Sequence, residues 1–325
     1  MRKRVKTWLK FGLSLAAAVG ILAWLLSRQN WAELSRTIVD VDWRWIAALG
    51  ALTVLYWWIR VTRWRWMTAL EQTPVSPGTA WVSMLAGLGV GLYTPLRGGE
   101  IIRPMFVPRG ARVRLAGWVL IERMFDLSAV LTLVLIGVVY AVFAGGVKLF
   151  GDKVLPAWIL LLCPLLLAGA LAGPLLIHFR PGGLWRMLGK ALPGKVKELA
   201  NVRLSRRQFG IFFLSSLLAE AVSVLTVFFC LRAFDSGREI GLLTACALSP
   251  LVMLHNIIPA TPGGFGVRET FATLIFCKLF GFNKATVLAA YLTNPLVVLV
   301  LPGAIGIIAA WVTGVTRHLA LEPAE

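Results

Sequence analysis

The sequence predicts an all-helical, polytopic integral membrane protein. Hydrophobic residues make up 58% of its 325 residues and charged residues only 15%, and the mean hydropathy is +0.78. Several apolar runs are long enough for a helix to cross a bilayer, which takes about 20 residues. The formal net charge of +18 comes from short basic clusters between these runs. Such clusters are typical of loops at a membrane surface rather than of a nucleic-acid-binding face.

The apolar runs predict six spanning helices and one helix at the membrane surface. We expect crossings near residues 8–26, 43–62, 115–143, 155–179, 208–231 and 285–312. Apolar residues at spacings of three and four from Trp31 to Trp45 predict a helix that lies in the interface. Tryptophans interleaved with Arg60, Arg63 and Arg65 form an aromatic and basic belt, which we interpret as the exit of the second crossing.

Two further apolar segments, near 80–108 and 242–280, are broken by Gly and Pro, and we predict that each forms a re-entrant hairpin. Basic clusters flank the first segment on both sides, and a hairpin that enters and leaves from the cytoplasm keeps both clusters inside. Three crossings separate the two hairpins, so the second opens to the opposite face. The pair then forms an inverted repeat within a single transmembrane domain, residues 1–325. Full crossings in place of the hairpins are the alternative.

The first hairpin carries the motif T-P-L-R-G-G-E-I-I-R-P, residues 94–104. Gly98 and Gly99 let the backbone turn and expose N–H groups at the start of a half-helix, and helix N-termini attract anions. Arg97 and Arg103 add full charges that suit a pair of phosphate oxygens. The motif therefore predicts a site for a phosphate-bearing headgroup. In the alternative, the glycines allow close helix packing and the arginines extend to the inner membrane surface.

The second hairpin carries N-I-I-P-A-T-P-G-G-F-G-V-R-E, residues 256–269, which repeats the same parts. Its turn and charged residues are Pro262, Gly263, Gly264, Gly266, Arg268 and Glu269. Paired Gly/Pro breaks in two halves of a membrane protein indicate a transport site between structural repeats. The pattern does not decide whether Glu269 touches a substrate or pairs with an arginine.

Acidic residues also lie within the predicted crossings. Glu122 and Asp126 are four residues apart and share a helix face, with Arg123 one step round it. Because ionisable residues in a span face a bundle interior or a watered cavity, we expect a counter-charge to the motif arginines; anchoring at the interface is the alternative. Glu220 lies about 18 Å along its helix, near the midplane, where an unpaired carboxyl could couple transport to protons.

The sequence predicts no catalytic site, metal or cofactor. No acid–base pair, nucleophile with its base or nucleotide-binding loop is visible. The four cysteines are far apart without metal-ligand spacing, and His255 stands alone.

Three motifs occur in order along the chain: residues 94–104, I-E-R-M-F-D at 121–126, and I-P-A-T-P-G-G-F-G-V-R-E at 258–269. In these motifs the chain resembles the flippase-like membrane family related to the transmembrane region of lysylphosphatidylglycerol synthases. The resemblance implies a domain that moves or binds lipids, which in relatives are aminoacylated phospholipids, hopanoid-related lipids or lipid-linked sugars. It implies a central site lined by Gly98, Gly99, Glu100, Arg103, Glu122, Arg123, Asp126, Gly263, Gly264, Gly266 and Glu269.

The predicted function is a lipid flippase in a bacterial cytoplasmic (inner) membrane, with both termini in the cytoplasm. The expected partners are membrane lipids, namely an anionic or aminoacylated phospholipid or a lipid-linked sugar, and not nucleic acid. No soluble aminoacyl-transfer domain follows Glu325, so we expect this chain itself not to be an enzyme of lipid synthesis. A lipid-modifying membrane enzyme and a non-transporting accessory subunit of a lipid-synthesis complex stay open, as do a homo-oligomer and a partner lipid-synthesis enzyme.

Overall fold

The computed structural model describes residues 30–313 except 93, 144–161, 180–203, 236–239 and 258–260, together with residues 20, 23, 24 and 27. The described residues form helices and contain no strand, which confirms the all-helical class. The predicted crossing at 8–26 and the start of the one at 155–179 lie outside the described residues, apart from isolated positions.

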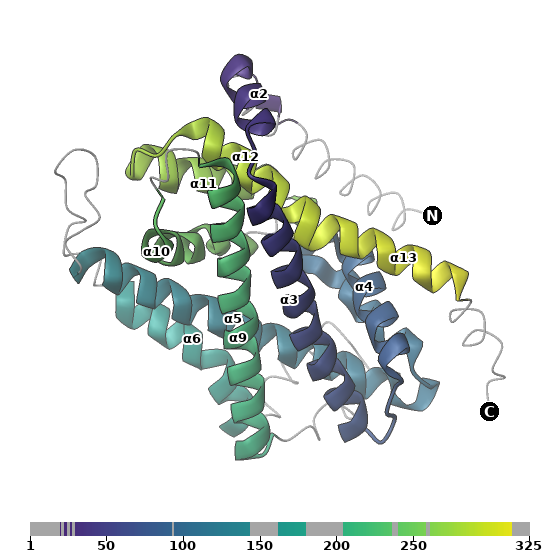
Figure 1. Cartoon of the computed structure of the whole chain (residues 1–325). Helices are drawn as coiled ribbons and strands as arrows, with labels where there is room; N and C mark the ends of the chain where they lie inside the picture. The colour runs from purple at the N-terminus through teal and green to yellow at the C-terminus, as the bar shows by residue number, and fades with distance from the viewer. Residues whose placement is uncertain are drawn as a thin grey trace, which may run out of the picture.

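Two long antiparallel helices, α3 (Trp43–Leu70) and α9 (Arg206–Phe234), lie side by side at the front of the bundle (Figure 1). At one end the backbone N–H of Asp42 donates to the carbonyl of Ala233 over 2.9 Å. At the other end Trp66 contacts Phe212, with ring centroids 5.3 Å apart. Both helices are long and apolar enough to cross a membrane, as is the continuous C-terminal helix Lys284–Val312.

The remaining long helices cross behind and beside this pair. Helix α5 (Arg112–Phe143) runs behind α3 and α9 and packs against α6 (Leu162–Phe179) (Figure 1). The C-terminal helix consists of α12 (Lys284–Pro295), a π-helical turn η8 (Leu296–Val300) and α13 (Leu301–Val312). The π turn follows Pro295, whose missing N–H interrupts the regular hydrogen bonding of the helix.

The predicted surface helix is shorter than expected. Helix α2 (Trp31–Val39) is capped at its start by Asn30, whose side chain accepts hydrogen bonds from two backbone N–H groups of the first turn. It ends before Asp42, which caps the start of α3. The pattern from Trp31 to Trp45 therefore covers two helices, because the apolar spacing continues across an aspartate cap that starts a new one.

Both Gly/Pro-broken segments form folded-back pairs of helices. Helix α4 (Pro77–Leu92) is followed by the 3₁₀ helix η1 (Pro95–Phe106), which packs back against it. A short turn, η2 (Arg109–Ala111), then leads into α5. With 16 residues, α4 is only about 24 Å long, which is shorter than the hydrocarbon core of a bilayer. The face to which each hairpin opens, and hence the inverted repeat, stays a prediction.

The second folded-back segment is broken more often. It consists of α10 (Leu242–Met253), η5 (Leu254–Ile257), η6 (Pro262–Gly264), α11 (Val267–Ala272) and the π-helical η7 (Thr273–Leu279). The 3₁₀ helices η1 and η6, one from each hairpin, are in contact with each other. The two sequence motifs, separated by more than 150 residues, therefore meet in space.

The interpretation of Arg60 and Arg63 as part of a surface belt is wrong. Helix α3 continues to Leu70 rather than ending near Thr62, and Arg60 and Arg63 have exposed fractions of only 1% and 3%. These two arginines are three residues apart, so they share the helix face that packs against α5 and α9. They belong to the interior of the bundle, and the belt interpretation holds only for neighbours such as Trp58, which is exposed.

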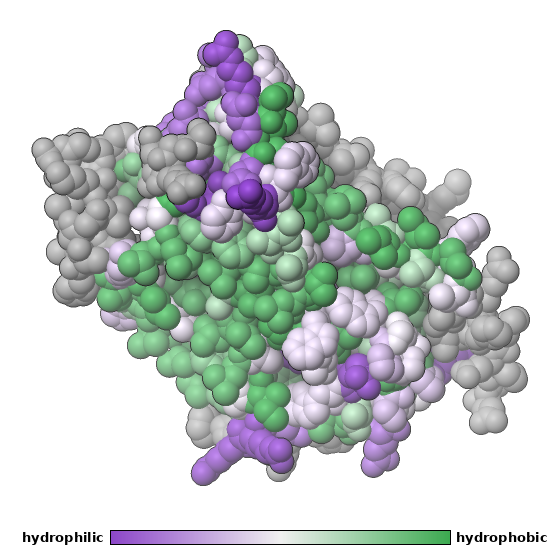
Figure 2. All heavy atoms as spheres, in the orientation of Figure 1, coloured by the Kyte–Doolittle hydropathy of each residue, from purple (hydrophilic) through white to green (hydrophobic). Residues whose placement is uncertain are grey.

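The surface supports a membrane setting. Figure 2 shows apolar side chains across the middle of the face formed by α3 and α9, with hydrophilic side chains at its upper end near α2 and at its lower end. The exposed apolar residues of this band include Val54 and Trp58 of α3 and Leu214 and Leu218 of α9. A soluble protein rarely exposes so continuous an apolar surface, whereas a bilayer requires it.

Candidate functional site

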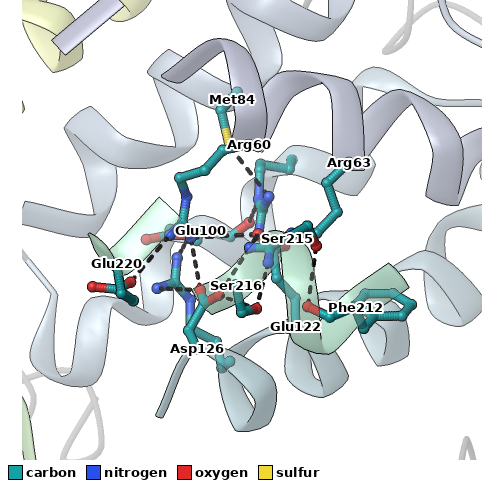
Figure 3. A network of polar contacts seen from close by, with 12 residues as sticks. Arg60, Arg63, Met84, Glu100, Glu122, Asp126, Phe212, Ser215, Ser216 and Glu220 are labelled. Atoms are coloured by element: carbon teal, nitrogen blue, oxygen red, sulfur yellow. Dashed lines mark hydrogen bonds and ion pairs between the residues drawn. The ribbon is translucent and has the colours of Figure 1, made fainter. Parts of the chain in front are cut away.

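A network of ionisable side chains lies between α3, η1, α5 and α9 (Figure 3). Among the described residues it contains four arginines and four carboxylates, and the charges of these eight side chains balance when all are ionised. The members are Arg60, Arg63, Arg103, Arg123, Glu100, Glu122, Asp126 and Glu220. Arg60 and Arg63 were not among the predicted site residues.

Glu122 is the centre of this network. It has no exposed surface, and its carboxylate accepts hydrogen bonds from Arg63 at 2.6 Å, from Arg103 at 2.7 Å and from Arg60 at 3.3 Å. These arginines come from α3 and η1, whereas Glu122 lies on α5. One carboxylate thus holds together three elements, of which α3 is about 60 residues away in the sequence.

Asp126, one helical turn further along α5, connects the network to α9. It accepts hydrogen bonds from Arg60 at 3.0 Å and from Arg63 at 2.9 Å. The hydroxyl of Ser216 on α9 donates to Asp126 over 2.8 Å and accepts from Arg63 over 2.5 Å. Glu220, one turn further along α9, lies 3.9 Å from Arg60.

Arg103 of the first motif is held on every side. Its Nη2 bonds Glu122, its Nη1 lies 3.2 Å from the sulfur of Met84, and its guanidinium lies over the ring of Trp64 at 5.2 Å. A side chain at Gly87 would place its Cβ 2.7 Å from Cγ of Arg103. This glycine of α4 therefore makes room for the arginine. Because Arg103 has no exposed surface, it positions the hairpin and does not line the cavity.

Other residues of the first hairpin also contact protein groups. Glu100 forms an ion pair with Arg123 of α5. The N–H of Gly99 donates to the hydroxyl of Thr94 over 2.7 Å, and a Cβ at Gly99 would lie 2.5 Å from the backbone of Gly91. Gly99 thus lets η1 pack closely on α4, as in the alternative interpretation of this motif. The side chain of Arg97 and the surroundings of Gly98 lie outside the described part of the structure.

A cavity of about 490 Å³ lies beside the network and is lined by residues of both hairpin regions. Its lining carries Arg123, Asp126 and Glu220, together with residues of the second motif and of the segment before it. The second-motif residues include Thr261, Gly263, Gly264 and Arg268, with His255 next to them. Thr94 of the first motif and hydroxyl residues of α9, α10 and α12 complete the polar lining. This size is within the range of small-molecule sites in proteins.

The three glycines of the second motif have backbone angles that other residues rarely adopt. Gly263, Gly264 and Gly266 have φ angles of +62°, +75° and +83°, in the left-handed region where a Cβ is unfavourable. A Cβ at Gly264 would also lie 2.8 Å from the ring of His255. The Gly-rich turn therefore brings bare backbone to the cavity wall.

Glu269 has a structural role in this turn. Its Oε2 accepts the N–H of Gly266 over 2.6 Å, and its Oε1 accepts from Nη2 and Nε of Arg268 over 2.6 and 3.2 Å. Glu269 is fully buried, whereas Arg268 lines the cavity and lies over the ring of Phe265 at 5.3 Å. The sequence left open whether Glu269 pairs with an arginine, and here it does.

The predicted site residues therefore fall into two groups. Those that line the cavity are Arg123, Asp126, Glu220, Gly263, Gly264 and Arg268. Those that lie buried behind it are Gly99, Glu100, Arg103, Glu122, Gly266 and Glu269. The side chains of Pro262 and Arg97 and the surroundings of Gly98 lie outside the described part. The residues of the second group contact other protein groups, and which of the predicted site residues contact a ligand stays a prediction.

Comparison with known proteins places the whole arrangement in one family. The model of the family described as "Lysylphosphatidylglycerol synthase TM region" matches residues 9–306. No curated protein matches the chain.

The network predicts a strong coupling between Arg103 and Glu122. Breaking a buried ion pair by removing one partner costs about 3–5 kcal/mol, so R103Q and E122Q should each lower the melting temperature of the purified protein markedly. The double variant keeps the network neutral, so its loss should be smaller than the sum of the two single losses. The measurement is thermal unfolding followed by tryptophan fluorescence.

The matched control is R114Q. Arg114 pairs with Glu71, but its side chain is 45% exposed, and an exposed pair contributes at most about 1 kcal/mol. Equal small effects for R114Q, R103Q and E122Q, or strictly additive losses in the double variant, would contradict the network's role.

Proposed function

The chain belongs to the family of the lysylphosphatidylglycerol synthase TM region, and from this premise we propose that it is a translocase for a phosphate-bearing membrane lipid. The headgroup passes through the central cavity while the acyl chains stay in the bilayer. One observation carries the proposal. The two Gly/Pro-broken hairpin regions meet at one charged cavity inside a helical membrane bundle. Broken helices at membrane depth are tolerated where protein or a water-filled cavity surrounds them.

The charges around the cavity suit a phosphate headgroup. Arg123 of α5 and Arg268 of α11 both line the cavity, and guanidinium groups match phosphate oxygens in geometry and charge. The bonds to Glu269 use Nε and Nη2 of Arg268, and its Nη1 makes no hydrogen bond among the described residues. Asp126 and Glu220 give the same cavity negative charge, so a headgroup that also carries a cation fits as well as a purely anionic one.

The distribution of charge supports an orientation with the lower end of α3 and α9 in Figure 1 in the cytoplasm. This end carries Arg65, Arg112, Arg114, Arg206 and Arg207, with Glu71 paired to Arg114. At the opposite end, α2 and the start of α3 mix Arg36 and Arg44 with acidic residues. By the positive-inside rule the basic end faces the cytoplasm, here that of a bacterial inner membrane.

Alternating access would follow from movement of one hairpin region against the rest of the bundle. The ion-pair network fixes the first hairpin to α3 and α5 through Arg103 and Glu122. The second hairpin contacts the first mainly through short 3₁₀ segments. Movement of the second hairpin about its glycines would open the cavity to one face and then to the other, without breaking the buried ion pairs.

A cavity-blocking variant tests this function. Ser223 lines the cavity from α9, and S223W should reduce translocation of a fluorescent phosphatidylglycerol in proteoliposomes at least about tenfold, because the indole fills the path of the headgroup. The control L214W places the same side chain on the same helix at a position that is 64% exposed, and it should leave the rate unchanged.

Mass spectrometry of the lipid recovered from these vesicles distinguishes the other two candidates. A translocase returns the lipid chemically unchanged, so a new lipid species would favour a lipid-modifying enzyme. Equal rates for S223W, L214W and empty vesicles would favour an accessory subunit and end the translocase proposal.

Glu220 is the residue that we propose for proton coupling. It is 9% exposed and borders the cavity with Asp126, Arg123, Arg268 and His255. If its protonation accompanies transport, the translocation rate of the parent protein should vary with pH, and this variation should disappear in E220Q. E71Q makes the same change away from the cavity and should keep the parent profile. Identical pH profiles for E220Q and the parent would exclude the coupling role.

A further inference from the structure

A second cavity opens on the side of the bundle, between α4, η1 and α13, which lie together at the right of Figure 1. Its volume is about 590 Å³, and it shares no lining residue with the central cavity. Its apolar walls are formed chiefly by Ala86, Val90, Ile102, Phe106, Ile307 and Trp311. Apolar walls on a surface that faces lipid suit an acyl chain rather than a polar solute.

Among the described residues, the charged side chains that line this side cavity are both arginines and none is a carboxylate. Arg109 of η2 is exposed, and Arg112, the first residue of α5, is partly buried. The Nε of Arg112 donates to the carbonyl of Val107 over 2.8 Å. Its Nη2 is buried without a hydrogen-bond partner among the described residues. A buried donor left unpaired costs free energy, so this nitrogen indicates an acceptor from outside the chain.

We propose that the side cavity binds one anionic phospholipid, with its phosphate on Arg109 and Arg112 and one acyl chain along α4 and α13. Charge complementarity selects an anionic headgroup, and the apolar walls select a lipid over a free anion. Trp311 at the rim is 76% exposed, as tryptophans at a membrane interface often are. In the orientation proposed above, this lipid belongs to the cytoplasmic leaflet, where anionic lipids attract basic residues.

The proposed lipid binding in the side cavity does not depend on the proposed translocation of lipid through the central cavity. The side cavity is lined mainly by α4, η1 and α13, none of which lines the central cavity. The bound lipid would fill the space between α4, η1 and α13, and so support the hairpin whose Arg103 enters the network. The protein could therefore retain an anionic lipid even if it transports none.

Photo-crosslinking of the full chain in phosphatidylcholine nanodiscs tests this site. The probe is a trace of phosphatidylglycerol with a diazirine in one acyl chain, and crosslinks should map to peptides that contain Met105 or Trp311. The same diazirine on phosphatidylcholine should label these peptides much less. Loss of both arginines in R109Q/R112Q should weaken phosphatidylglycerol binding about thirtyfold, since each basic residue near an anionic lipid contributes about fivefold.

The matched control is R206Q/R207Q, which removes two exposed arginines at the start of α9 and should leave the labelling unchanged. Equal labelling by the two lipid probes in the parent protein would overturn the proposal without any variant, as would unchanged labelling in R109Q/R112Q. Displacement of the lipid probe by millimolar inorganic phosphate would show an anion site rather than a lipid site, and would overturn it too.

Discussion

The carboxylate of Glu122 and the three arginines around it are the interaction on which the rest of the structure depends. Charged groups inside a membrane bundle are costly unless they are paired. Here Arg60, Arg63 and Arg103 meet Glu122 with no water-exposed surface on the carboxylate. The pairing fixes α3, α5 and the first hairpin relative to one another, and Asp126 with Ser216 extends the same constraint to α9. The central cavity has a defined shape because its wall is the edge of this network.

The structure distinguishes two roles of arginine that the sequence motifs do not distinguish. Arg103 and Arg268 each lie in a Gly-rich motif near a glutamate, but Arg103 is fully buried among protein groups, whereas Arg268 reaches the cavity. Arg112 represents a third case, in which one guanidinium nitrogen is bonded and another is buried without a partner. The positioning arginines hold the helices in place, and the arginines at the two cavities are the ones that suit lipid phosphate. Arg123 belongs to both groups, because it pairs with Glu100 in the network and also lines the central cavity.

Much of the architecture could be predicted from the sequence, because hydropathy and Gly/Pro breaks are local signals. They predicted the helical class and the three described helices that are long and apolar enough to cross a membrane. The likeness of the two motifs indicated that they meet, and the segments that carry them are in contact. Arg60 and Arg63 were assigned to the membrane surface because their neighbours are tryptophans, while their partners lie some 60 residues away on α5. The role of Glu269 was undecided because adjacency to Arg268 does not show which groups a buried side chain contacts. Pairing between distant elements is a tertiary property, and a single sequence does not carry it.

The central claim is that the cavity between the two hairpin regions receives a lipid headgroup while the buried network stays intact. An electron cryo-microscopy structure of the protein in nanodiscs that contain excess phosphatidylglycerol tests this claim most directly. The account predicts phosphate density within hydrogen-bonding distance of Arg123 or Arg268, with the contacts of Glu122 to Arg63 and Arg103 preserved. Lipid density confined to the outer surface of the bundle, with protein side chains filling the central cavity, would contradict it.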